Sequence, residues 1–476
     1  MSLRRHRTVR FSAMPLAIGA FIVPLIVACA LFMENVDATV LVTALPSLAR
    51  DLGEDPITLK LAVTSYVVGL GVFIPICGWV ADRFGPRTVF RAAIGVFVVG
   101  SLLCAASNSL FTFVLARFVQ GVGGAMMVPV GRIIIFRSVA RADFVRAVNY
   151  LTVPALLGPV VGPLLGGFIT TYLHWRLMFF INVPIGLLGI YLTNRHIDDV
   201  RDTEPGHLDW PGFVLSAGGA SLFMLGMSLV GSDVVSDRAT AIMCVVGIVL
   251  SGLYVLYARR AKNPLLDLRF LRIPTFHTSV MGGSLFRIGL GAVPFLLPLA
   301  LQEGLGMTPF EAGMITCASA FGALFMKTLA QPLLRRFGFR PVLMANAALS
   351  GLALASYGLF HPEMSRGVIW VIVLFGGIFP SLQFTALNAL AYAEIDSGDV
   401  GRATSVASVI QQMSLGLGVT VAGIVLQLSH YVQGHAQIVW TDFWPAFLVL
   451  GLFSAASIPV TARMPRGAGR ELTRGR

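Results

Sequence analysis

The sequence predicts an all-α polytopic membrane protein, and three observations lead to that class: composition, long apolar runs and the placement of basic residues. Hydrophobic residues make up 56% of the 476 residues and charged residues 12%, which is about half the charged share of a soluble domain. Apolar runs of about twenty residues recur from end to end, and each can cross a hydrocarbon core of roughly 30 Å. Lipid offers no partner to an open backbone, so these runs must be helices.

About fourteen such runs follow one another, each as long as a membrane-spanning helix needs to be. In chain order they lie near 17–46, 58–80, 88–107, 110–134, 148–172, 177–194, 211–230, 240–258, 276–301, 312–334, 341–360, 367–392, 403–429 and 443–462. Deep inside them stand the acids Glu34 and Asp37 and the basic residues Arg117, Arg287 and Lys327.

The net charge of +12 is distributed unevenly between the two sides of the predicted bundle. If the N-terminus is cytoplasmic, the inside segments hold most of the 35 lysines and arginines, as in MSLRRHRTVR, RFGPRTVFR and RRFGFR. The outside loops hold only Arg50, Lys60, Arg176, Arg238 and Arg366. This is the positive-inside rule, and it predicts that both termini are cytoplasmic. The basicity is therefore a signal of topology, and we expect no nucleic-acid partner.

Cofactor and metal motifs are missing from the sequence. The five cysteines stand singly in apolar spans, and none of the eight histidines forms an HExxH motif. No GxxxxGK[ST] segment occurs, so we expect no bound nucleotide, no metal and no other cofactor. The sequence contains no recognisable nucleophile–base set, so we do not expect an enzyme. LIVAC, ending at Cys29, resembles a lipoprotein signal, but cleavage there would destroy the first span. Any energy-requiring process that this protein carries out must therefore be driven by ion or solute gradients.

An internal repeat divides the chain. RFGPR at 83–87 and RFGFR at 336–340 each follow a span that ends in the cytoplasm. We interpret them as matching hairpins of two six-helix halves, 1–195 and 273–476, with two further helices inserted in 196–272. Two parallel repeats with a site between them are a common plan of secondary transporters. Chance recurrence of a basic hairpin remains the alternative.

Several motifs resemble those of the major facilitator superfamily. GWVADRFGPR (78–87) is similar to the superfamily's GxLADRxGRK loop, and LARFVQGVGGA (115–125) to its fourth-span motif RxxQGxGxA. GPVVGPLLGG (158–167) resembles the fifth-span motif associated with antiporters. VDATVLVTALP, HWRLMFFINVPIG and LDWPGFVLS resemble segments of the fourteen-span drug:proton antiporters. LARFVQGVGGAMMVPVGR and FRIGLGAVPF are similar to an MdtD-like bacterial branch regarded as multidrug exporters.

The resemblance implies a major facilitator fold with two six-helix halves plus two inserted helices, in a bacterial inner membrane. Three residues depart from the family pattern. Val42 stands where the first motif has an asparagine, and Pro86 replaces a basic residue of the hairpin. Arg335 occupies the repeat counterpart of Asp82, so the second hairpin lacks an acid there.

The first span carries two acids in an apolar setting, and each needs a partner or water. At 1.5 Å per residue, Asp37 lies at about the same depth as Arg117 of the fourth span, so the two can pair. We interpret Asp37 as a proton site tuned by Arg117; a permanent structural ion pair is the alternative. Glu34 lies one turn away on the same face, and mutual repulsion favours a proton on one acid. The alternative for Glu34 is a neutral, hydrogen-bonded packing residue.

Two segments predict conformational gating. Gly158, Gly162 and Gly166 recur every four residues on one face of the fifth span, beside Pro163 and Gly167, and small faces let helices approach closely. We expect a bending seam or, alternatively, plain tight packing. By resemblance, the hairpin residues latch the two halves in the outward-facing state: Gly78, Asp82, Arg83, Gly85 and Arg87. Topology anchoring explains its arginines almost as well.

Polar residues inside the spans are candidate substrate contacts: Tyr66, Gln120, Gln383, Asn388, Gln411 and Gln412. Arg287 and Lys327 join them, although Lys327 can instead extend to the cytoplasm. If both line the cavity, the three cations outnumber Glu34 and Asp37. That balance favours an anionic or zwitterionic solute.

The predicted function is a proton-coupled secondary active exporter of small molecules, with multidrug efflux by alternating access. Export of an organic anion such as a carboxylate metabolite is the alternative within transport. A non-transporting membrane sensor or scaffold is the alternative of another class. The expected partners are a small-molecule substrate, protons and the lipid bilayer, and we expect a monomer.

Overall fold

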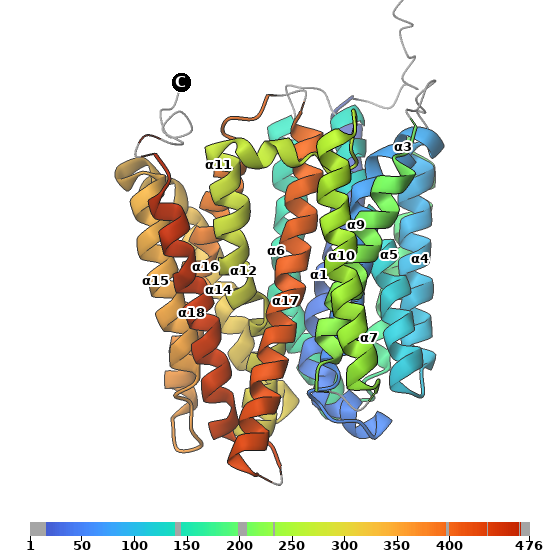
Figure 1. Cartoon of the computed structure of the whole chain (residues 1–476). Coiled ribbons are helices and arrows are strands. Elements are labelled where there is room, and N and C mark those ends of the chain that lie inside the picture. The colour runs from blue at the N-terminus through green and yellow to red at the C-terminus, as the bar shows by residue number, and fades with distance from the viewer. Residues whose placement is uncertain are drawn as a thin grey trace, which may run out of the picture.

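The computed structural model describes residues 16–138, 144–198, 207–231, 234–396, 399–435, 437–465 and 467, and every regular element among them is a helix. The long helices run side by side along one axis (Figure 1). Within the described ranges, twelve helical segments are long and apolar enough to cross a membrane, and a shorter apolar helix covers Leu157–Tyr172. The fold is therefore that of a multi-pass membrane protein.

The helices coincide with the runs predicted from the sequence. The first six spans are α1 (Leu16–Leu52), α2 (Lys60–Phe73) with η1 (Ile74–Ile76) and α3 (Cys77–Phe84), α4 (Pro86–Ala106), α5 (Leu110–Ser138), α6 (Phe144–Tyr172), and α7 (Leu177–Phe180) with α8 (Asn182–His196). The inserted pair is α9 (Trp210–Leu229) and α10 (Asp237–Arg260). The last six spans begin with a broken helix made of α11 (Pro274–His277), η3 (Thr278–Gly282), α12 (Gly283–Gly291), α13 (Val293–Leu299) and η4 (Ala300–Gly304). The next four are α14 (Pro309–Phe337), α15 (Phe339–Tyr357), α16 (Arg366–Ala391) and α17 (Val400–Gln433). The last is η5 (Trp440–Asp442) with α18 (Phe443–Ala462).

The two RFG hairpins have the same backbone geometry. Gly85 separates α3 from α4 at φ 87°, and Gly338 separates α14 from α15 at φ 78°. Only glycine adopts these positive φ values without strain. Pro86 then begins α4, where a proline loses no helical hydrogen bond. The departure at Pro86 is thus compatible with the hairpin.

The helix pairs of the first six spans recur in the last six. α1 packs on α6 as α12 packs on α17, α2 on α5 as α14 on α16, and α4 on α8 as α15 on α18. The fold therefore consists of two six-helix halves, with α9 and α10 packed on each other and α9 also on α2 and α17. The boundaries near residues 195 and 272 stay predictions.

The linker that follows α10 is fixed to the C-terminal half by charges. Asp267 accepts hydrogen bonds from Arg269 and, at 2.7 Å, from Nη2 of Arg402 at the start of α17. The hydrogen bond from Arg269 lowers the pKa of the Asp267 carboxyl. The inserted helices are thereby connected to α17 through an ionised side chain.

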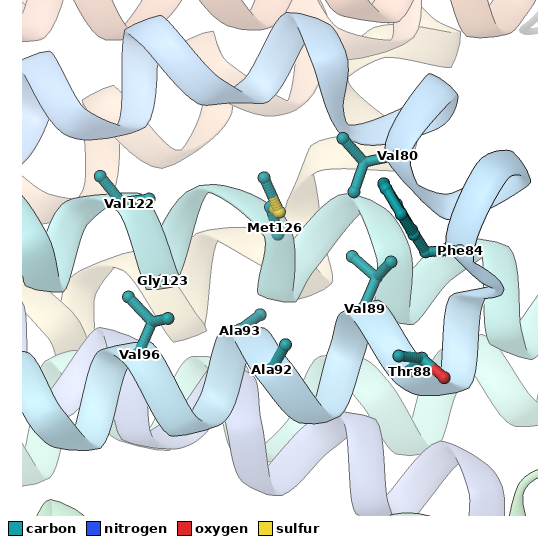
Figure 2. A pocket seen from close by; sticks show the side chains of 10 residues that line it. All are labelled: Val80, Phe84, Thr88, Val89, Ala92, Ala93, Val96, Val122, Gly123 and Met126. Atoms are coloured by element: carbon teal, nitrogen blue, oxygen red, sulfur yellow. The ribbon is translucent and has the colours of Figure 1, made fainter.

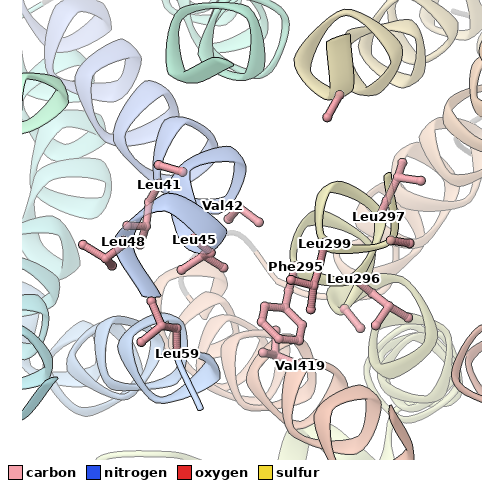
Figure 3. Close-up of a cluster of buried hydrophobic side chains, with 14 of the residues drawn as sticks. Leu41, Val42, Leu45, Leu48, Leu59, Phe295, Leu296, Leu297, Leu299 and Val419 are labelled. Atoms are coloured by element: carbon pink, nitrogen blue, oxygen red, sulfur yellow. The ribbon is translucent and has the colours of Figure 1, made fainter. Parts of the chain in front are cut away.

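The two halves are closed at one end of the bundle. A buried apolar cluster joins Leu41, Val42, Leu45, Leu48 and Leu59 of the N-terminal half to Phe295, Leu296, Leu297, Leu299 and Val419 of the C-terminal half (Figure 3). The large clusters around Phe97 and around Phe286 each stay within one half. The closed end carries the loops predicted to be outside, so the predicted orientation would place this closed end on the periplasmic side.

Candidate functional site

Asp37 lies at the centre of a buried polar network. Its carboxylate accepts hydrogen bonds from Nη1 of Arg117 at 2.7 Å, Nε2 of Gln120 at 2.8 Å and Nδ2 of Asn182 at 2.8 Å. Asp37 is 5% exposed and Arg117 1% exposed. A buried ion pair is tolerated when further hydrogen bonds satisfy its remaining atoms. Gln120 and Asn182 supply two such further hydrogen bonds to Asp37.

Ser101 connects this network to a fourth helix. The Ser101 hydroxyl accepts from Nε2 of Gln120 at 2.8 Å and from Nδ2 of Asn182 at 3.0 Å. Side chains of α1, α4, α5 and α8 therefore meet at one point in the N-terminal half. The ring of Tyr66 on α2 lies 4.5 Å from the Arg117 guanidinium carbon, a cation–π contact.

The glycines of QGVGG bring these helices close enough for short side chains to meet. A Cβ on Gly121 would collide with the backbone of Tyr66, and one on Gly123 with the backbone of Phe97. On the opposite side, a Cβ on Gly100 of α4 would lie 2.7 Å from the backbone of Gln120. Arg117 and Gln120 thus supply the polar atoms, while the glycines set the helix separation.

Glu34 has a different environment from Asp37. It is half-buried on α1, and its Oε2 atom is buried without a hydrogen-bond partner. The Tyr66 hydroxyl lies nearby and is also buried without a hydrogen bond. The Tyr66 hydroxyl is the donor within reach of a charged Glu34, but no hydrogen bond of normal geometry joins them; a poorly satisfied buried charge is costly, whereas three donors reach the Asp37 carboxylate. The two acids therefore differ in how readily each tolerates a change of charge.

The glycine seam of α6 faces α1, which carries both acids. Added Cβ atoms at Gly158, Gly162 and Gly166 would meet Asn35, Thr39 and Val40. This close contact lies within the N-terminal half.

The outer end of α6 contacts the other half. A Cβ on Gly167 would lie 2.5 Å from the carbonyl of Pro309, and the Phe310 amide donates to Oγ1 of Thr171 at 3.0 Å. A Cβ on Gly313 would collide with the carbonyl of Pro163. Helix α6 therefore connects the acid-bearing α1 to α14 across the interface between the halves.

The α3–α4 hairpin contacts its own half in this conformation. Arg87 donates to the carbonyl of Asn194 at 2.6 Å, and Arg91 to its side-chain oxygen at 3.0 Å. Arg83 is exposed, and a Cβ at Gly78 would meet open space. An apolar groove between α3, α4 and α5 adjoins the hairpin and is lined by Val80, Phe84, Val89, Ala93, Val122 and Met126 (Figure 2). Its lining includes none of the residues bonded to Asp37.

The candidate cavity residues are spread over several environments. Gln120 belongs to the Asp37 network, and the ring of Tyr66 contacts Arg117 of that network. Gln383 is 1% exposed and accepts from Nδ2 of Asn346 at 3.1 Å. Asn388 is exposed, Gln411 and Gln412 are half-buried, Arg287 is buried and Lys327 is exposed. Their contact with a substrate stays a prediction.

Three groups were missed at the sequence level. Asn182 and Ser101 complete the Asp37 network, and Asn182 carried the usable signal of a polar residue in an apolar span. Asp442 accepts from Nδ1 of His430 at 3.1 Å and Nδ1 of His435 at 2.9 Å, and from the Val439 amide at 3.0 Å. These three side chains come within 4.8 Å of one another. Their mutual hydrogen bonds account for the arrangement at the start of α18.

The comparisons with known proteins agree on one family. The family model described as Major Facilitator Superfamily matches residues 27–258 and 279–474. "Putative multidrug resistance protein MdtD" of Salmonella heidelberg (strain SL476) is 36% identical over 445 residues, covering 92% of this chain and 94% of that protein. The protein of the same name from Salmonella typhimurium (strain LT2) gives the same identity and coverage.

Solved transporter structures share the fold. A D-xylose-proton symporter superimposes with a TM-score of 0.69 at 15% identity, covering 94% of this chain and 99% of that chain. An auto-inhibited peptide transporter of the POT family gives 0.67 at 16% identity, covering 94% and 97%. The halves, the buried network and the matched family model lead to one conclusion: the chain belongs to the Major Facilitator Superfamily.

Proposed function

We propose that this protein is a proton-coupled exporter that exchanges inward-moving protons for outward-moving small molecules by alternating access. Family membership makes it a membrane transporter and not an enzyme. The MdtD relatives are named for multidrug resistance, and we extend multidrug efflux to this chain. It would act as a monomer in a bacterial inner membrane with both termini in the cytoplasm.

The observation that carries the proposal is a pair of membrane-embedded acids with unequal partners. Asp37 is paired with Arg117, while Glu34, one turn away, has a buried oxygen without a partner. Intramembrane ionisable groups of this kind are typical of proton relays. A proton that arrives at or leaves this pair changes the charge facing Arg117, and with it the hydrogen bonds that hold α1 to α5 and α8.

A mechanical path runs from the acids to the other half. The glycines of α6 lie against α1, and the outer end of α6 contacts α14. A shift of α1 that follows protonation would therefore be transmitted to the α6–α14 contact that closes the outer end. A sensor or scaffold needs neither the buried acids nor this path.

Transport into inverted membrane vesicles tests the proposal. With an acidic interior, wild-type vesicles are expected to accumulate a test solute, either the cation ethidium or the anion salicylate, above its outside concentration. Nigericin in potassium buffer, which collapses the pH gradient, should remove the accumulation. A scaffold would accumulate neither solute, and accumulation that survives nigericin would exclude proton coupling.

A further inference from the structure

The C-terminal half places positive charge in the membrane without a matching acid. Its spans contain Arg287 and Lys327 away from their ends. All aspartates and glutamates of these spans and their loops lie at or beyond span ends: Glu303, Glu311, Glu363, Glu394, Asp396, Asp399 and Asp442. The N-terminal half instead provides Asp37 as the counter-charge of Arg117. The two halves therefore differ in their capacity to take up an anion.

Arg287 is buried with few partners. It is 4% exposed, its Nε atom has no hydrogen bond, and its Nη1 atom reaches only the Ser279 carbonyl at 3.4 Å. The ring of Phe384 lies 5.9 Å away. Among the described residues no carboxylate pairs with Arg287. An unpaired buried charge is strongly destabilising, so a site that keeps one is suited to an external anion.

The Arg287 side chain points into the C-terminal bundle. A Cβ on Gly283 would lie 2.6 Å from Nη1 of Arg287 and 3.3 Å from a methyl group of Leu387 on α16. Met281, on another face of the same helical span, is 43% exposed. The guanidinium therefore lies beside α16, on the inner side of the span.

Lys327 lies on the face of α14 that is turned away from lipid. Met314, Phe321 and Phe325 form an exposed apolar stripe on this helix, at 47%, 47% and 58% exposure. Lys327 follows Phe325 by two residues, or about 200° around a helix, so it lies nearly opposite that stripe. Gly313, about 40° from Lys327 by the same count, contacts α6 of the other half. Lys327 therefore lies on the side of α14 that is turned toward the N-terminal half.

Arg287 lies 13 residues after Pro274 and Lys327 lies 10 residues before Phe337, so both are about 15–20 Å from the same end of the C-terminal half. Phe286 and Met326, the residues that precede Arg287 and Lys327, belong to the same buried cluster. A guanidinium and an ammonium group both bind carboxylates through charge-assisted hydrogen bonds. One solute between the halves can therefore be approached by both.

We propose that Arg287 and Lys327 form an anion-binding subsite and that the exported solutes are organic carboxylates rather than lipophilic cations. This inference rests on the proposed export function. The division of labour follows from the charges: the acids of the N-terminal half handle protons, and the cations of the C-terminal half hold the solute. Exchange of one proton for a monocarboxylate moves two positive charges inward, so an interior-negative potential assists export.

Binding to the purified full-length protein tests the subsite without requiring transport. The apparent affinities of salicylate, succinate and ethidium would be measured from the rise in melting temperature with concentration. Both carboxylates are expected to stabilise the wild type. Arg287→Gln should weaken their binding about tenfold or more, which is the effect of losing a hydrogen bond to a charged group. Arg287→Lys should recover part of it, because charge remains while the planar donor pair is lost.

Lys327→Gln and a control on the same helix complete the set. Lys327→Gln is expected to weaken carboxylate binding, whereas Arg335→Gln, which removes an exposed cation near the end of α14, should leave it unchanged. Ethidium binding should be unaffected or tighter in Arg287→Gln. No stabilisation of the wild type by either carboxylate, or unchanged carboxylate affinity in Arg287→Gln, would overturn the subsite. Gradient-driven ethidium export without carboxylate binding would overturn the subsite and support the proposed export function. Carboxylate binding that depends on Arg287, without any gradient-driven export, would support the subsite and overturn the proposed export function.

Discussion

Asp37→Asn is expected to abolish export driven by a pH gradient and to lower the free energy of unfolding by about 3–5 kcal/mol, the cost of removing one partner of a buried ion pair. The substitution keeps the size of the side chain but leaves the Arg117 guanidinium without a counter-charge in a site that is almost inaccessible to water. Accumulation of salicylate and ethidium in inverted vesicles measures the first effect. Chemical denaturation of the purified protein measures the second.

Asp51→Asn is the matched control. Asp51 lies on the same helix and pairs with Arg176 at 2.8 Å, but its side chain is 36% exposed. Exposed pairs of this kind contribute about 0–1 kcal/mol, so this variant should resemble the wild type. If Asp37→Asn accumulates solute against its gradient as well as Asp51→Asn does, the account of the ion pair is wrong.

Gly162→Leu is expected to abolish transport while the protein still inserts into the membrane. A Cβ at this position would collide with the Thr39 side chain on α1, and the remaining atoms of leucine need still more room. Overpacking of this kind costs about 1–3 kcal/mol. Separating α6 from α1 would also uncouple the acids from the α6–α14 contact. Vesicle transport and the amount of inserted protein are measured together.

Gly95→Leu separates this effect from a general intolerance of bulk. Gly95 lies within α4, and an added Cβ there would meet no atom within 4 Å. The same substitution should therefore be tolerated. Normal exchange by Gly162→Leu would show that the contact between α6 and α1 does not gate transport.

The helices were predictable because hydrophobic length is a local property of the sequence. Each apolar run corresponds to a helix, and the two hairpins fall at the RFG segments because glycine permits the turn. The breaks within the second and ninth spans were not predicted. Pro75 lies within η1, and Pro294 lies in the first turn of α13 after the interruption at Ala292. A proline kink depends on how neighbouring helices satisfy the freed backbone groups, which the sequence does not state.

The site was predictable in depth but not in direction. Counting residues along two helices places Asp37 and Arg117 at the same level, and their charged groups lie 2.7 Å apart; their role in proton transfer stays a prediction. Asn182 and Ser101 could not be assigned to this network from the sequence. The sides of the helices that turn toward one another depend on tertiary contacts. The direction of Lys327 was open for the same reason; the exposed stripe of Phe321 and Phe325 lies on the opposite side of α14, and contact of Lys327 with a solute stays a proposal.

The most direct test of the central claim is the movement of protons driven by a solute gradient. In proteoliposomes that contain a trapped pH dye, an imposed gradient of whichever solute is transported, salicylate or ethidium, should drive protons in the opposite direction through the wild type. Glu34→Gln should still exchange labelled for unlabelled solute but produce no pH change, because it retains Asp37 and Arg117 and lacks the acid that is free to change charge. A pH change of wild-type size in Glu34→Gln, or none in the wild type while solute is exchanged, would contradict proton coupling through these acids.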